Sequence, residues 1–227
     1  MHVLGIETSG DVAGVALAGE GGVLVEYAVR APRAHSRLLL DLVARAMEAA
    51  GLAGRQLVGL AVSAGPGSFT GLRIGFAAAR TLAQVWGLPL AAVPTPEALA
   101  HPLVRAGATV CAVITARRGE VYAALYRPGP DGPACLAGPA ALPVERLPEF
   151  AARAGEPVVL VGDVPPAVGE NAAVPVARAP QAMNYPRPAV VAELGLVRLK
   201  GAAPDPLLVQ PLYVGAPRVR GGGRHGL

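Results

Sequence analysis

The chain has 227 residues, of which 52% are apolar and 16% are charged, and its formal net charge is +4. This length allows one large domain or two small lobes with a buried core, and no apolar run reaches the roughly 20 residues that cross a bilayer. The first residues lack the pattern of a signal peptide and the two cysteines form no CxxC pair, so we expect a cytoplasmic protein without a disulfide framework or a zinc cluster.

The first half of the chain changes from strand-like to helix-like patterns. Three short apolar runs, joined by turns that contain glycine, predict a β-meander. A helix is expected next, with Ser36 as its N-cap and its end near Ala50, and an unbroken apolar strand follows at 57–65. A glycine-rich turn then leads to a second helix, another buried strand and a third helix, which starts at Thr95 and continues with a proline and an acid.

The second half repeats this order loosely, as three strands, a helix, a strand and a last helix over residues 189–201. The repeated order β-β-β-α-β-α predicts an α/β protein with two lobes of similar topology. We expect an N-terminal lobe over residues 1–104, a C-terminal lobe over 105–214 and a flexible, basic Gly- and Arg-rich tail over 215–227. The tail is either solvated or in contact with nucleic-acid phosphates.

The stretch SAGPGSFTGLRIG at residues 63–75 raises the question of a nucleotide site. No lysine follows Gly71, where a phosphate loop requires one, and Thr70 stands where a Rossmann loop has its third glycine. The helix that follows still presents N–H groups that can bind an anion. The alternative is a tight strand-to-helix turn in which Ser68 or Thr70 caps the helix, and the residues favour this structural interpretation.

The hairpin ETSGDVAG near the N-terminus is a second candidate site. Backbone N–H groups in such a turn can face a phosphate, which makes Thr8, Ser9 and Gly10 candidates for cofactor binding. Glu7 and Asp11 are candidates to hold a magnesium-bound water. Ser, Thr and Gly are also ordinary residues of a hairpin turn, so a purely structural role stays open.

Other catalytic constellations find little support in the sequence. The chain has four histidines, which are His2, His35, His101 and His225. None pairs with another at i, i+4, and neither HExxH nor GxSxG occurs, which argues against a metal site and against serine hydrolysis. Arg117 and Arg118 at a predicted hairpin tip either meet a phosphate or a partner's carboxylate or form a solvated turn.

Several stretches together resemble the TsaB (YeaZ) family. They are LGIETS near the start, HSRLLLDLVARAM at 35–47, SAGPGSFTGLRIGFAAARTLA at 63–83, TARRGEVYAALY at 115–126 and PLYVG at 211–215. The match covers nearly the whole chain in order, and GPGSFTGLRIG is its specific part.

The resemblance implies a two-lobed fold similar to the actin and sugar-kinase (ASKHA, ribonuclease H-like) group. It implies a non-catalytic scaffold in the bacterial tRNA threonylcarbamoyladenosine machinery, which pairs with the catalytic paralogue TsaD, with the ATPase TsaE and with a second copy of itself. That assembly transfers a threonylcarbamoyl group to the adenosine beside the anticodon of tRNAs reading ANN codons, and this subunit meets tRNA only indirectly. ATP and a metal belong to the partner subunits, so we expect no cofactor, no metal and no catalytic residue on this chain.

The helices expected at 36–50 and 71–86 are rich in Leu and Ala, which suits a helix-to-helix interface. By helical spacing, the predicted contact residues are Leu38, Leu42, Arg45, Met47, Arg73, Ala77 and Arg80. Leu42→Glu is expected to break association without unfolding the chain, because it leaves an unpaired charge in an interface. Two alternatives stay open: both helices only cover the sheet, or the chain is an actin-fold ATPase or phosphotransferase that acts alone through the hairpin at 8–11.

Overall fold

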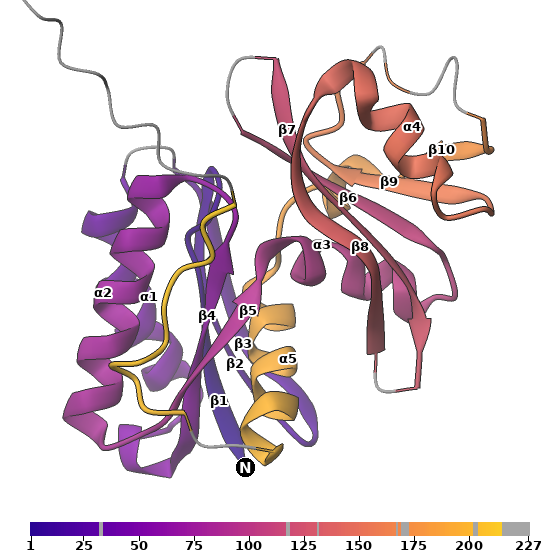
Figure 1. Cartoon of the computed structure of the whole chain (residues 1–227). Coiled ribbons are helices and arrows are strands. Elements are labelled where there is room, and N and C mark those ends of the chain that lie inside the picture. Colours follow the sequence, from indigo (N-terminus) through magenta and orange to yellow (C-terminus); the bar gives the residue numbers. More distant parts are fainter. Residues whose placement is uncertain are drawn as a thin grey trace, which may run out of the picture.

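The computed structural model describes residues 1–31, 34–116, 119–130, 132–166, 168, 173–201 and 204–214. These residues form two five-stranded sheets with helices packed against them (Figure 1). The predicted α/β class with two similar halves is confirmed. No helix in the described ranges is both long enough and apolar enough for a bilayer crossing.

The first sheet has the strand order β3-β2-β1-β4-β5. The strands β1, β2 and β3 form an antiparallel meander, and β4 and β5 add to β1 in parallel, each after a helix. Their bounds are His2–Glu7 for β1, Val12–Gly19 for β2, Gly22–Arg30 for β3, Leu57–Gly65 for β4 and Leu90–Pro94 for β5.

The second sheet repeats this arrangement in the order β8-β7-β6-β9-β10, again with an antiparallel meander followed by two parallel strands. The short edge strand β10 lies in a proline-rich stretch where the sequence pattern predicts a loop. The bounds are Val110–Thr115 for β6, Glu120–Gly129 for β7, Gly132–Pro143 for β8, Val158–Gly162 for β9 and Val176–Arg178 for β10.

Five α-helices cover the sheets, together with three short 3₁₀ turns at 54–56, 144–146 and 181–183. On the first sheet, α1 and α2 pack on one face and α5 packs on the other (Figure 1). On the second sheet, α4 and α3 bury opposite faces. The bounds are His35–Ala49 for α1, Phe69–Trp86 for α2, Thr95–Arg105 for α3, Leu147–Ala152 for α4 and Pro188–Gly201 for α5.

The last helix of each half packs against the sheet of the other half. Helix α3 contributes Leu99 and Val104 to the core of the second sheet, and α5 contributes Val191 and Leu194 to the core on the first sheet. The lobes at 1–104 and 105–214 therefore stay a proposal about the chain's division, since the two halves exchange a helix.

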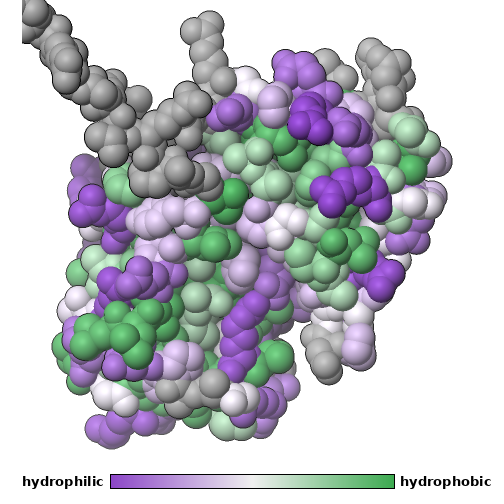
Figure 2. All heavy atoms as spheres, viewed as in Figure 1, coloured by the Kyte–Doolittle hydropathy of each residue, from purple (hydrophilic) through white to green (hydrophobic). Residues whose placement is uncertain are grey.

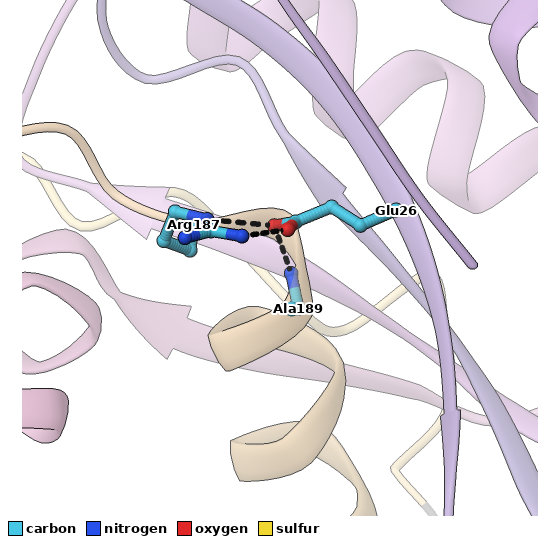
Figure 3. A network of polar contacts seen from close by, with 3 residues as sticks. All are labelled: Glu26, Arg187 and Ala189. Carbon is cyan, nitrogen blue, oxygen red and sulfur yellow. Dashed lines mark hydrogen bonds and ion pairs between the residues drawn. The ribbon is translucent and has the colours of Figure 1, made fainter. Parts of the chain in front are cut away.

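The crossing of the chain into α5 is anchored by a glutamate of β3 (Figure 3). The Glu26 carboxylate is 13% exposed and accepts a hydrogen bond from the Ala189 N–H at 3.0 Å, which caps the first turn of α5. Arg187 donates both its Nε, at 3.1 Å, and an Nη2 hydrogen to the same carboxylate. One side chain of the first sheet therefore fixes where the returning helix begins.

The starts of α1 and α2 differ in their capping. Helix α1 begins at His35 after Ala34, with no side-chain hydrogen bond at its cap, so the prediction that Ser36 is the N-cap is wrong: Ser36 already lies in the first turn. In α2 the Ser68 Oγ accepts the Gly71 N–H at 3.2 Å, which confirms the predicted cap.

The C-terminal segment 204–214 runs back along the first sheet on the side of α2 (Figure 1). Its backbone bonds to the ends of two strands: Leu90 N–H donates to the Pro204 carbonyl at 3.3 Å, and Leu212 N–H donates to the Ala64 carbonyl at 2.6 Å. Between these points, Arg80 of α2 donates to the Val209 carbonyl.

Candidate functional site

The hairpin after β1 surrounds a fully buried carboxylate. Glu7 is 0% exposed, and its Oε1 accepts the Ser9 N–H at 2.5 Å and the Ser9 hydroxyl at 2.6 Å. Its Oε2 accepts the hydroxyl of Ser63 on β4. Burial raises the pKa of Glu7 from its ordinary 4.5 to about 7, against the opposing effect of the hydroxyl donors on Ser63 and Ser9. The carboxylate therefore joins two strands.

This geometry decides between the two roles that the sequence allows for Glu7. Both of its oxygens are engaged within the protein, and the side chain does not reach the solvent, so it is not placed to hold a magnesium-bound water. Asp11 is exposed and pairs with Arg30 at 3.5 Å. In the described part of the chain, no three His, Cys, Asp or Glu side chains form a group that could hold a metal ion.

The glycine-rich turn is shaped to receive this hairpin. The Thr8 hydroxyl donates to the Gly71 carbonyl at 2.8 Å, and the Ser68 N–H donates to the Ser9 carbonyl at 2.7 Å. A Cβ on Gly71 would lie 2.0 Å from the Thr8 carbonyl oxygen, and one on Gly75 would lie 2.2 Å from the Thr8 hydroxyl. The glycines therefore permit close approach of the hairpin to α2, which confirms the structural interpretation of the turn.

A cleft of about 820 Å³ lies between the two halves of the molecule. Of the three cofactor candidates, Ser9 and Gly10 line it, whereas Thr8 points into the contact with α2. The opposite wall comes from the ends of β6 and β9, including Thr115 and Asp163. The candidates thus divide between the cleft wall and the internal contact.

The structure separates the predicted contact residues by their exposure. Arg45, Arg73 and Ala77 are exposed on the outer faces of α1 and α2, whereas Leu38 and Met47 are half-buried against the core. These positions remain predictions as partner contacts.

Two other contact candidates are already engaged within the chain. Leu42 is 9% exposed and belongs to the core under α1, so the expectation that Leu42→Glu leaves the fold intact is wrong, because the charge would enter that core. The Arg80 guanidinium lies 5.4 Å from the centre of the Phe76 ring and holds the C-terminal segment through Val209.

Sequence reasoning missed several exposed apolar residues on the same side of the molecule. Leu40 of α1 is 57% exposed, and Phe69 and Val85 of α2 are 58% and 73% exposed. Figure 2 shows apolar side chains gathered over α2 where the C-terminal segment crosses it, and Leu207 and Leu208 of that segment are 59% and 76% exposed. A leucine in the run Leu38-Leu39-Leu40 carries no signal of its own that separates an outer position from an inner one.

Two predicted features lie outside the described residues. They are the pair Arg117 and Arg118 and the basic tail at 215–227. The roles considered for them from the sequence therefore stay predictions.

Comparison with known proteins gives one family. The family model of TsaD, described as tRNA N6-adenosine threonylcarbamoyltransferase, matches residues 16–200. The tRNA threonylcarbamoyladenosine biosynthesis protein TsaB of Bacillus subtilis is 35% identical over 127 residues, which are 56% of this chain and 56% of that protein. The TsaB protein of Escherichia coli is 38% identical over 134 residues, or 58% of each chain. The chain thus spans a little over half the length of these relatives.

Solved structures agree with the sequence comparison. YeaZ from Pseudomonas aeruginosa superposes with a TM-score of 0.77 at 26% identity, covering 94% of this chain and 99% of that chain. The ethanolamine utilization protein EutJ from Carboxydothermus hydrogenoformans, at a TM-score of 0.53 and 14% identity over 88% of this chain and 90% of that one, shows the actin-like fold alone. The predicted resemblance is confirmed: the chain belongs to the TsaD family of the matching model and, within it, to the TsaB (YeaZ) group.

Proposed function

We propose that this chain is a non-catalytic scaffold subunit that supports the transfer of a threonylcarbamoyl group to the adenosine next to the anticodon of tRNAs reading ANN codons. It docks onto the catalytic paralogue TsaD and works with the ATPase TsaE, and tRNA meets it only through the assembly. The curated relatives are named as proteins of tRNA threonylcarbamoyladenosine biosynthesis, and the matching family model is that of the transferase.

The observation that carries the proposal is the exposed outer surface of α1 and α2, which we call the docking face. It includes Leu40 and Phe69, both more than half exposed, and the exposed Ala77. The Arg73 guanidinium lies 5.4 Å from the centre of the Phe69 ring, so a charged group borders the apolar surface. Aromatic side chains and arginines are the residues enriched in protein interfaces.

The hairpin chemistry supports the absence of turnover in this subunit. Glu7 is enclosed by Ser9 and Ser63, and Thr8 is committed to α2. The residues that an ATPase acting alone would use at this hairpin are thus engaged in holding the first sheet together. ATP and the metal of the reaction remain, in this proposal, with the partner subunits.

The identity of the occupant follows from the relation between the two proteins. A TsaD paralogue has helices of the same origin, since one family model describes both chains, and such helices can pair with the docking face in a quasi-symmetric way. A second copy of this chain can use the same face. The homodimer and the complex with TsaD then exclude each other.

The test uses the full chain and its TsaD partner with one substitution on the docking face. Ala77→Glu places a charge on an exposed helix position, so the monomer stays folded, but a desolvated charge in the complex costs about 3 kcal/mol, or about a hundredfold in affinity. Ala106→Glu, at the exposed end of α3, is the matched control and should bind normally.

Both variants are then compared in a tRNA modification assay with TsaD and TsaE. Modification should fall with Ala77→Glu and persist with Ala106→Glu. Equal binding by both variants would contradict the docking face. Saturable Mg-ATP binding and hydrolysis by the isolated chain would instead favour an enzyme that acts alone.

A further inference from the structure

Three helices begin at the cleft between the two halves. The cleft is lined by His35 and Ser36 at the start of α1, by Ser68 and Thr70 at the start of α2, and by Thr95 at the start of α3. The first N–H groups of a helix have no partner inside the helix, and the helix dipole places a partial positive charge there. The cleft therefore receives three donor-rich helix ends.

Two buried polar side chains in this cleft lack a partner among the described residues. His35 is 6% exposed and its Nε2 makes no hydrogen bond, and Thr95 is 2% exposed and its hydroxyl makes none. Both line the cleft. A buried polar group without a partner is costly and rare in folded proteins, so these atoms indicate that a bound group completes their hydrogen bonds.

The charged side chains at the cleft are already engaged, unlike these two. Arg30 pairs with Asp11 at 3.5 Å and lies 5.6 Å from the centre of the Tyr185 ring. The Asp163 carboxylate accepts the Thr115 N–H at 3.0 Å. Both acids are exposed. The unsatisfied groups thus lie in the buried part of the cleft, and the charges lie nearer its mouth.

This arrangement selects the chemistry of the ligand. Helix starts and a hydroxyl donate hydrogen bonds to an oxyanion, and about 820 Å³ is more than a lone inorganic ion requires. One paired arginine beside two carboxylates does not match the charge of a nucleoside triphosphate. The site fits a small molecule with one oxyanion group and a less charged remainder.

We propose that the buried part of this cleft binds a small metabolite through a carboxylate or phosphate group, which Thr95 and His35 contact. The docking face lies on the outer surfaces of α1 and α2, so this site is separate from it. The proposal holds whether or not the chain serves as a scaffold, because it concerns binding by the isolated protein.

The experiment is a titration of the ¹⁵N-labelled full chain, followed by NMR, with sodium acetate and with sodium phosphate at constant ionic strength. Either anion should give saturable shifts of the His35, Ser36 and Thr95 amides at millimolar concentrations, while sodium chloride should not. Acetate and phosphate represent the two possible head groups, and the one that binds more tightly identifies the class.

Variants connect the shifts to the cleft. Thr95→Val removes the hydroxyl at nearly constant volume and should weaken binding about five- to tenfold, as expected for one lost hydrogen bond. Thr95→Ser keeps the hydroxyl and should retain binding, which separates loss of the ligand contact from loss of the fold. Thr81→Val, on an exposed part of α2 outside the cleft, should bind like the parent protein.

Two results would overturn the proposal. One is shifts that grow linearly with either anion and are reproduced by chloride, which means that water alone satisfies His35 and Thr95. The other is saturable binding that Thr95→Val leaves unchanged, which places the anion elsewhere. Tight binding of Mg-ATP at the same amides would refute the small size and single head group inferred for the ligand.

Discussion

Replacing Glu7 by glutamine should remove a pH dependence of stability that the parent protein shows. Burial raises the pKa of Glu7 from 4.5 to about 7, so folding favours the protonated carboxyl. The stabilisation from this group is complete below pH 4.5 and is lost as the pH rises through about 7. With these two values, the linkage relation gives a loss of about 2.5 kcal/mol between pH 5 and pH 8.

The measurement is urea unfolding of the parent protein and of Glu7→Gln at several pH values. The difference in unfolding free energy between the two proteins should change by about 2.5 kcal/mol in favour of the glutamine variant from pH 5 to pH 8. Taking this difference cancels other groups that titrate in the range, such as Glu193, whose pKa burial also raises. A difference that does not change with pH would refute the reasoning, since it would mean that Glu7 stays ionised in the folded protein throughout.

Three further predictions concern packing. Gly71→Ala should destabilise by about 3 kcal/mol in urea unfolding because its Cβ meets the Thr8 carbonyl, whereas Gly10→Ala, with open space around it, should change stability by less than about 0.5 kcal/mol. Leu42→Ala should cost about 2–5 kcal/mol as a core truncation, while the exposed Leu40→Ala should leave stability unchanged and weaken TsaD binding measured by calorimetry. Glu26→Ala should cost about 1–2 kcal/mol and speed hydrogen exchange at the start of α5; unchanged exchange would argue against Glu26 as the anchor.

Local patterns predict most of the elements because local chemistry determines them. The run at 57–65 is apolar without interruption and coincides with β4, and Ser68 forms the cap that its position suggests. The repeated strand order also follows from the pattern, since each meander is joined by short turns. The start of α1 was misjudged because a serine near a helix start resembles a cap even when the helix begins one residue earlier.

Long-range packing explains what the pattern does not predict. Helix α5 is apolar around much of its circumference, so its sequence does not say which sheet it covers, and its place depends on the anchor at Glu26. The missing partners of His35 and Thr95 are equally invisible in the sequence, because a hydroxyl at a helix start normally finds one. Leu42 looks like an outer residue only until the depth of the core under α1 is known.

The contact between Thr8 and Gly71 joins the two proposed sites through one helix. The start of α2 forms part of the cleft wall, and its outer surface carries Arg73 and Ala77 of the docking face. Because the glycines let the hairpin bond directly to the α2 backbone, a ligand that shifts the start of α2 also shifts the surface offered to the partner. Thermodynamic linkage requires this influence to be reciprocal: any factor by which an anion in the cleft changes the affinity for TsaD equals the factor by which TsaD changes the affinity for that anion.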